Sequence, residues 1–236
     1  MLKLTLHFSP GACSRVPLIA LEAIGVPFET ELMVFMKGAH KTPAFKKLNP
    51  SSKIPVLVVD GVPISQNIAI LTWLDAAYPD AKLLPRTENK MGQAQLLSSL
   101  AKFSSDLHPL VSRIRVPMFF CDIDGGPERV AAMAIDSIRD QLLPIEETLS
   151  QNDWLAGSHW SILDAYLHWV WFRITGAGFD PKDFPNISAH YARTLKNPAT
   201  QRAIAREAEA EKYLQENGLM PKFLKSKPAN ASATAA

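Results

Sequence analysis

The sequence predicts an α/β domain over residues 1–80 and an all-helical domain over residues 87–225, joined by a linker at 81–86. Segments that alternate apolar and polar residues are confined to the first range, where helical segments separate them. In the second range the apolar residues recur at helical spacing and no strand signal remains. Such a change of pattern along a chain is typical of two domains. Residues 226–236 are small or polar, and we expect them to form a disordered tail.

The first strands and helices follow from local patterns. Residues 2–8 alternate, with four apolar side chains on one face, which predicts a strand. After a Pro-Gly turn, residues 15–24 predict a helix that ends at Gly25, because glycine readily adopts the left-handed conformation of a helix end. A second strand over residues 28–34 and a short, capped helix over residues 43–48 come next.

A hairpin and a longer helix complete this domain. Residues 54–59 and 62–64 are predicted strands joined at Asp60-Gly61, which is a strong hairpin signal. Ser65 is predicted to cap a helix over residues 66–78. The resulting order, βαβαββα, is that of a thioredoxin-like domain.

Helices fill the C-terminal range. The segment 161–175 is apolar nearly all round, which predicts a buried helix, and Ser161 and Asp164 form a structural capping box at its start. Proline interrupts two other helices, at Pro109 and at Pro144, where the helix is bent or divided. The predicted helices cover residues 91–116, 128–150, 161–175, 187–195 and 199–214, and a loop covers residues 121–127.

Composition and charge are those of an ordinary globular protein. Of the 236 residues 47% are hydrophobic and 20% charged, and the formal net charge is +2. A charge this small argues against nucleic acid and against an anionic membrane as partners. The most apolar stretch, residues 165–172, is too short to cross a bilayer.

Cysteine use and the N-terminus indicate the cytoplasm. The two cysteines, Cys13 and Cys121, cannot build a disulfide framework and fit a reducing compartment. The first residues resemble a strand and lack the apolar core and cleavage site of a signal peptide. No His, Cys and Asp cluster has the spacing of metal ligands, so we expect no metal.

Four motifs follow one another in a specific order. Residues 9–14 read Ser-Pro-Gly-Ala-Cys-Ser, and residues 37–50 contain Lys-Gly-Ala-His-Lys-Thr-Pro-Ala-Phe and Leu-Asn-Pro. Residues 53–70 contain Lys-Ile-Pro-Val-Leu and Ser-Gln-Asn-Ile-Ala-Ile, and residues 161–166 read Ser-Ile-Leu-Asp-Ala-Tyr. In this order and spacing the chain resembles the cytosolic glutathione transferases, with beta-, phi- and zeta-type features mixed. The resemblance covers the chain except its tail.

The resemblance implies how the N-terminal domain holds glutathione. Ile54-Pro55 would have a cis peptide bond and expose the Ile54 backbone to the cysteinyl part of glutathione, whereas Pro55 alone would be an ordinary edge proline. Gln66 and Asn67 would bind the γ-glutamyl carboxylate at a helix N-terminus. Most members carry Glu-Ser there, so this chain lacks the charge that meets the glutathione ammonium group.

The glycyl carboxylate of glutathione would be held by basic residues. The resemblance assigns this role to His40 and Lys41, with Lys53 as a nearby point charge. Considered alone, lysines in a loop before a helix are solvated.

Cys13 is the first candidate for contact with the glutathione sulfur, and Ser14 is the second. Both lie at the start of the first helix, whose free N–H groups are expected to lower a thiol pKa or to bond to a thiolate. Cys13 matches the beta-type cysteine, and Ser14 matches the phi- and zeta-type hydroxyl donor; the alternative for Cys13 is simple packing. His108 matches a beta-type histidine that faces the sulfur, although Pro109 would kink its helix. Asp106 would reach glutathione of the partner subunit.

These expectations favour a glutathione transferase that conjugates the glutathione thiolate to a small hydrophobic electrophile, a detoxification reaction. Glutathione would be a co-substrate, and the resemblance implies a homodimer. Three alternatives remain open at this point: a glutathione-dependent isomerase, suggested by Gln66; a thiol-disulfide reductase, suggested by Cys13; and a non-catalytic binding protein, suggested by the departures at Gln66-Asn67 and Pro109.

Overall fold

The N-terminal domain is built on a four-stranded mixed sheet. The computed structural model describes residues 2–87 and 89–221, so the predicted tail at 226–236 lies outside the described residues. The sheet order is β2-β1-β3-β4. β1 is parallel to β2 and antiparallel to β3, and β3 and β4 form the predicted hairpin. The strands are β1 (Leu4–Phe8), β2 (Glu29–Leu32), β3 (Val56–Val59) and β4 (Val62–Ser65).

Helices cover both faces of this sheet. Leu4, Leu6 and Leu57 point to the face that packs against α1 (Arg15–Ile24) and α3 (Asn67–Ala77). Val56 belongs to the opposite face, where it packs with Phe45 of the short helix α2 (Pro43–Leu48). Because side chains alternate along a strand, neighbouring residues of β3 serve the two different layers. The thioredoxin-like fold class is confirmed.

Two local predictions need correction. The second strand was predicted over residues 28–34 but covers only Glu29–Leu32, and the stretch before α2, where no element was predicted, contains two single-turn 3-10 helices, Phe35–Lys37 and Ala39–Lys41. Ser65 was predicted to cap the helix after the hairpin, but it is the last residue of β4 and pairs with Val56. Gln66 occupies the cap position of α3 and makes no side-chain capping hydrogen bond.

The C-terminal domain is helical, as predicted. Its first long segment consists of α4 (Lys90–Lys102), a π-helical segment η4 (Phe103–Leu107) and α5 (His108–Arg115). Pro109 is at the start of α5, and the π-helical segment takes up the interruption that a proline without an N–H group imposes. The remaining elements are α6 (Gly126–Gln151), α7 (Ile162–Thr175), α8 (Pro185–Leu195) and α9 (Pro198–Glu216), with single-turn 3-10 helices at Pro79–Ala81 and Pro117–Phe119.

Two predictions concern the longest and the most buried helices. α6 continues through Pro144, so of the two alternatives at this proline, division of the helix is excluded. α7 is buried and begins at the predicted capping box. The Asp164 carboxylate accepts hydrogen bonds from the Ser161 backbone N–H and hydroxyl at 2.8 Å and 2.9 Å. None of the helices in the described part of the chain is long and apolar enough to cross a membrane.

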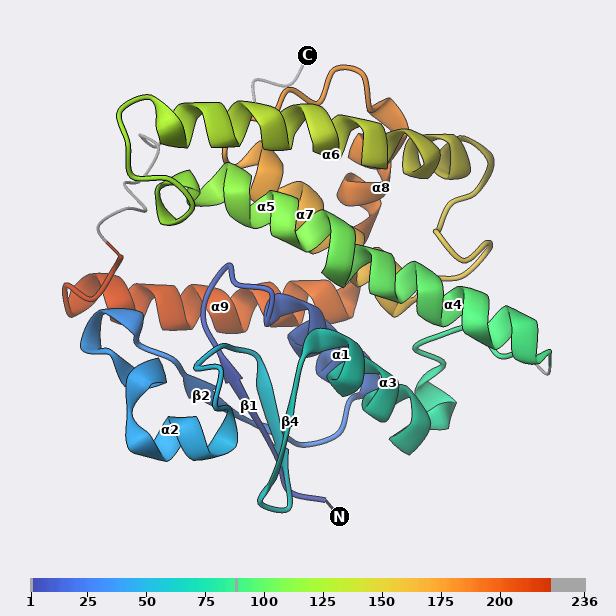
Figure 1. Cartoon of the computed structure of the whole chain (residues 1–236). Coiled ribbons are helices and arrows are strands. Elements are labelled where there is room, and N and C mark those ends of the chain that lie inside the picture. The colour runs from blue at the N-terminus through green and yellow to red at the C-terminus, as the bar shows by residue number, and fades with distance from the viewer. Residues whose placement is uncertain (1, 88, 222–236) are drawn as a thin grey trace.

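One continuous apolar core joins the two domains. Leu18 and Leu21 of α1 belong to the same buried cluster as Tyr166 and Val170 of α7. Figure 1 shows the sheet and its helices in the lower part of the view and the helical domain above, with α9 crossing between them. α9 is tied to α1 by an ion pair in which Arg15 Nε donates to Glu207 at 2.8 Å. The interface is therefore a packed core rather than a loose hinge.

Candidate active site

A cavity of about 760 Å³ lies at the junction of the two domains. Its N-terminal wall comes from the β1–α1 turn, the residues before β3 and the start of α3, and its helical wall comes from α5 and α7. We call it the main cavity. Predicted site residues on its walls are Cys13, Lys53, Ile54, Pro55, Gln66, Asn67 and His108.

Cys13 is half-buried at the N-terminal wall. Its thiol donates a hydrogen bond to the Ile54 carbonyl oxygen at a Sγ–O distance of 3.7 Å. Burial raises the pKa of this thiol to about 12, and the opposing effects of backbone N–H groups, Arg173 and Lys53 are smaller. The backbone N–H groups at the helix start lower the Cys13 pKa, as expected, but the expected net decrease of this pKa is wrong. Desolvation outweighs the helix terminus, so Cys13 is a protonated thiol at neutral pH.

Ser14 lies outside the main cavity. It is fully buried, and its hydroxyl donates to the Ser9 carbonyl at 3.3 Å and accepts from the Ser9 N–H at 3.2 Å. These two bonds close the turn between β1 and α1. The structure therefore uses Ser14 to shape the turn and places Cys13 on the wall.

The residues expected to bind the cysteinyl backbone and the γ-glutamyl carboxylate of glutathione line the same cavity. The Ile54-Pro55 peptide bond is cis, as the resemblance implied. Gln66 is exposed, lines the main cavity and has φ +73°, a region that residues other than glycine rarely adopt. Strained backbone of this kind gathers at functional sites.

Asn67 is occupied by internal contacts. Its amide nitrogen donates to the Cys13 carbonyl at 3.1 Å and to the Tyr166 hydroxyl at 3.3 Å, while its Oδ1 atom is buried without a hydrogen-bond partner among the described residues. The side chain thus bridges the two domains. A carboxylate at the start of α3 would meet backbone N–H groups and Gln66 rather than a free Asn67 amide.

His40 and Lys41 do not line the main cavity. They form a 3-10 turn, and the His40 ring packs edge-on against Phe35 with 5.0 Å between ring centroids. Lys53 does line the cavity, together with Asn49 and Ser52. Of the three residues predicted for the glycyl carboxylate, Lys53 lines the main cavity, and His40 and Lys41 do not.

His108 faces the cavity despite the neighbouring proline. Its Nδ1 atom lies 3.3 Å from the Tyr166 hydroxyl, and its ring is 4.6 Å from the Trp169 ring. Burial, followed by the charges of Lys53 and Arg173, lowers the His108 pKa to about 4. His108 is therefore neutral at pH 7. Asp106 is exposed and accepts a hydrogen bond from Ser105, away from this cavity.

Comparison with known proteins agrees with this geometry. The glutathione S-transferase N-terminal domain family matches residues 10–77, and the C-terminal domain family matches residues 107–198. The chain belongs to the glutathione S-transferase family.

Related transferases match nearly their full length. A glutathione S-transferase of Xanthomonas campestris pv. campestris is 29% identical, with 86% of this chain and 98% of the relative covered. The structure of a glutathione S-transferase from Xylella fastidiosa has a TM-score of 0.80 and 25% identity and covers 87% of this chain and 98% of that one. A sphingomonad glutathione S-transferase complexed with glutathione has a TM-score of 0.75 and 29% identity, with 86% and 98% covered.

Three residues of this transferase that line the main cavity were missed by sequence reasoning. Tyr166, Trp169 and Arg173 stand on one face of α7. The Trp169 indole N–H donates to the Gly11 carbonyl at 3.2 Å, which ties α7 to the turn beside Cys13. Their spacing of three and four residues was a readable signal of a shared helix face. The apolar run around them favoured packing instead, because it surrounds the whole helix.

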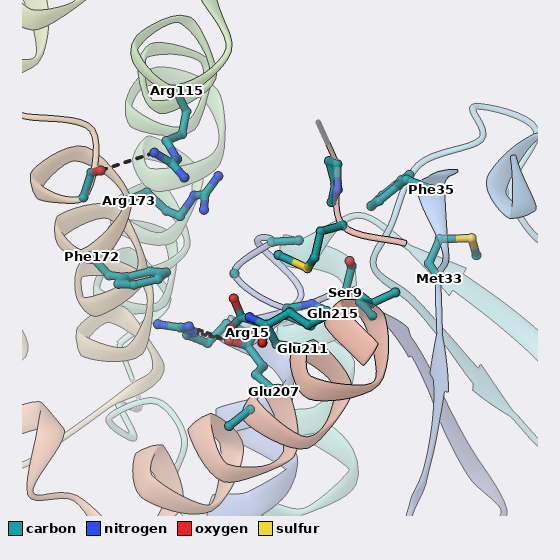
Figure 2. A pocket seen from close by; sticks show the side chains of 18 of the residues that line it. Ser9, Arg15, Met33, Phe35, Arg115, Phe172, Arg173, Glu207, Glu211 and Gln215 are labelled. Atoms are coloured by element: carbon teal, nitrogen blue, oxygen red, sulfur yellow. Dashed lines mark hydrogen bonds and ion pairs between the residues drawn. The ribbon is translucent and has the colours of Figure 1, made fainter. Parts of the chain in front are cut away.

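A second cavity, of about 500 Å³, adjoins the first (Figure 2). It lies between the β1–α1 turn, the ends of α5 and α7, and α9. Arg115 and Arg173 belong to the walls of both cavities. The two spaces therefore meet at these arginines and at the turn that leads to Cys13. In the described part of the transferase, no group of three or more His, Cys, Asp or Glu side chains is placed to hold a metal ion.

Proposed function

We propose that this protein transfers the thiolate of glutathione to an electrophilic carbon of a small molecule. One observation carries the proposal: a single cavity joins Cys13 and Ile54 of the thioredoxin-like domain to His108 of the helical domain. Family membership supports glutathione as the co-substrate, and the related sphingomonad structure is complexed with glutathione. We expect glutathione to lie along the N-terminal wall and the acceptor to lie against the helical wall.

Glutathione would be held largely by backbone groups. The N–H and C=O of Ile54 would pair with its cysteinyl residue, and the free N–H groups at the start of α3 would bind the γ-glutamyl carboxylate. Lys53 would bind the glycyl carboxylate, because it is the predicted cation that lines the cavity.

The reaction needs a stabilised thiolate. Glutathione loses its S–H proton to solvent, and the sulfur electron pair forms a bond to the acceptor carbon while the leaving group departs with its bonding pair. Cys13, protonated at neutral pH, would donate a hydrogen bond to the thiolate, and the charges of Arg173 and Lys53 favour an anion here. His108, neutral at pH 7, would add a polar contact without a charge.

The properties of Cys13 bear on the reductase alternative. A thiol-disulfide reductase needs a thiolate on the protein, and burial raises the Cys13 pKa to about 12. Its thiol is therefore poorly suited to attack a disulfide. This observation favours conjugation by the glutathione sulfur over a mechanism in which Cys13 is the nucleophile.

The proposal is tested by a conjugation assay with chlorodinitrobenzene, alongside calorimetric titration of glutathione. Saturable glutathione binding and a conjugation rate above the uncatalysed reaction are expected. Binding without turnover of electrophiles, peroxides, mixed disulfides or isomerisable substrates would assign the chain to the non-catalytic alternative. Absence of glutathione binding would reject the proposal.

We also propose a cytoplasmic homodimer, on the basis of family membership. Asp106 is exposed on the π-helical segment, as a residue that reaches glutathione of a partner subunit must be. Light scattering after size-exclusion chromatography is expected to give twice the mass of the chain. A mass equal to one chain would contradict the dimer and the role of Asp106.

A further inference from the structure

Two arginine side chains meet in the second cavity without a carboxylate partner. Arg115 comes from the last turn of α5 and Arg173 from the last turn of α7, and Figure 2 shows their guanidinium groups close together at one side of the pocket. Arg115 donates one hydrogen bond, to the Gly176 carbonyl at 3.3 Å, and its Nε atom is buried with no partner among the described residues. Within residues 2–87 and 89–221, neither arginine forms an ion pair.

The other charged groups of this cavity do not neutralise the pair. Arg15 and Glu207 are joined in a buried ion pair, visible as the dashed contact in Figure 2. Glu211, on α9, is the other carboxylate on the wall and is exposed to solvent. The balance near Arg115 and Arg173 is therefore positive. Burial and then the neighbouring Arg115 and Arg15 charges lower the Arg173 pKa to about 10, and together they outweigh the opposing effect of the Glu207 charge.

Arg173 is also next to the reacting end of the site. Gly11 has φ +68°, and a Cβ atom at this position would lie 3.1 Å from Arg173 Nη1, so the turn passes directly beside the guanidinium. Cys13 is two residues farther along this turn, and the Arg173 charge acts on its thiol. An anion bound by Arg173 would thus lie close to the expected position of the glutathione sulfur.

We propose that the acceptor substrate is an electrophile that carries a carboxylate, bound by Arg115 and Arg173. This inference rests on the proposed transferase function and specifies its substrate class. A guanidinium group presents a planar set of donors that matches a carboxylate, and two such groups fix the orientation of a small acid. Phe172, Met33 and Phe35 supply apolar surface around the same cavity for the rest of the molecule. The acceptor expected from the sequence, a small hydrophobic electrophile, would leave both cations unpaired if it carried no acidic group.

A matched pair of electrophiles tests the proposal. Chlorodinitrobenzoate and its methyl ester share one ring and one leaving group and differ in a negative charge. We would measure kcat/KM for both with glutathione, each divided by its uncatalysed rate, in the wild-type protein and in Arg173→Met and Arg115→Met. Methionine retains much of the apolar stem of arginine. Arg129→Met, at an exposed position of α6 outside both cavities, is the control.

The wild-type protein should prefer the acid. Loss of the Arg173 charge beside the thiolate should slow both reactions, so the ratio of the two kcat/KM values is the readout. Arg173→Met should lower kcat/KM for the acid by about tenfold to a hundredfold more than for the ester, because charge-assisted hydrogen bonds to the carboxylate are lost only with the acid. Arg115→Met should change this ratio in the same direction, and Arg129→Met should change neither value. An equal loss for acid and ester would overturn the proposal and leave Arg173 only its role beside the thiolate. A wild-type preference for the ester would overturn it as well.

The transferase function and the carboxylate site at Arg115 and Arg173 can be tested separately. If neither electrophile reacts faster than in the uncatalysed reaction, the transferase function is wrong. Calorimetric titration with the thioether formed from glutathione and chlorodinitrobenzoate still decides the anion site, since it requires no turnover. Tighter binding of this acid than of its methyl ester, lost in Arg173→Met, would support the site, and equal binding would reject it.

Discussion

The two walls of the main cavity are built in different ways. The N-terminal wall presents backbone groups, at Ile54 and at the start of α3, and one thiol at the β1–α1 turn. The helical wall presents side chains of α7, above all Tyr166, Trp169 and Arg173. Backbone groups are the same whatever the sequence, whereas side chains change with every substitution. Under the proposed function, glutathione recognition therefore depends on the backbone geometry of the thioredoxin-like domain, and acceptor choice depends on side chains of α5 and α7.

The largest effect is expected for the alkylation rate of Cys13, the thiol of the N-terminal wall. At pH 8, Cys13 should be alkylated by iodoacetamide roughly a thousandfold more slowly in the folded protein than in the unfolded chain, because its pKa rises from 9.0 to about 12. Peptide mass spectrometry after timed quenching measures the rate, with Cys121 as internal reference. The sign for stability follows: this contribution is present below pH 9 and is lost as pH rises toward about 12. Equal rates in the folded and unfolded chain would contradict a buried, protonated thiol.

The helical wall should be destabilised by loss of the Asp164 carboxylate, which forms the capping box at the start of α7. Asp164 accepts hydrogen bonds from the Ser161 N–H and hydroxyl, from the Leu155 N–H and from His190 of α8. Asp164→Ala should lower the free energy of unfolding by about 3 kcal/mol, because these four donors lose their acceptor. Urea denaturation measures the change. Asp183→Ala, which removes an exposed ion pair with Arg139, should lower it by less than about 1 kcal/mol and serves as control. Equal effects of the two variants would contradict the role of the capping box.

The histidine of the helical wall should be visible in the pH dependence of stability. The folded pKa of His108 is about 4 and its ordinary value is 6.5, so the unfolded chain binds a proton in this window that the folded chain does not. Its contribution is present above pH 6.5 and is lost as pH falls toward about 4.

Replacement of this histidine should therefore flatten the profile. In His108→Gln, the loss of unfolding free energy on acidification should shrink by up to about 1.4 kcal/mol per pH unit. Urea denaturation at several pH values measures the slope. His159→Gln, at an exposed position, should leave the slope unchanged. An unaltered slope in His108→Gln would show that this ring is not buried in its neutral form.

The N-terminal wall should respond weakly to added charge. Gln66→Glu introduces the carboxylate that the family resemblance leads us to expect at the start of this helix, where it would meet the glutathione ammonium group. Glutathione affinity should rise by about twofold to fivefold, because an exposed ion pair contributes little. Calorimetry measures the dissociation constant, and Gln95→Glu on α4 is the control. Unchanged or weaker affinity in Gln66→Glu would show that the ammonium group lies elsewhere.

The difference between the two walls also explains which features could be predicted from the sequence. The strands and the hairpin at Asp60-Gly61 depend on local signals, whereas the cis peptide bond at Pro55 was implied by the family resemblance; the structure contains each of them. Local signals could not decide whether Cys13 or Ser14 is the candidate for contact with the glutathione sulfur. That choice depends on which side chain closes the β1–α1 turn. The Cys13 pKa depends on desolvation of the thiol in the folded protein, which no local pattern reveals. The two 3-10 turns before α2 had no readable signal, and His40, which lies in the second of them, does not line the main cavity.

The helical wall depends on contacts between distant segments. Tyr166 meets Asn67 and His108, and these three residues come from α7, α3 and α5. Nothing in the local pattern of α7 distinguishes cavity residues from core residues, since the helix is apolar on nearly every face. The π-helical segment before Pro109 was equally hidden, although it lets His108 face the cavity.

A crystal structure of the protein soaked with glutathione tests the central claim most directly. The account predicts glutathione along the N-terminal wall, with its cysteinyl backbone paired to Ile54, its γ-glutamyl carboxylate at the start of α3, and its sulfur between Cys13 and Arg173. Glutathione bound in another place, or bound at this wall with its sulfur turned away from Cys13, would contradict the account.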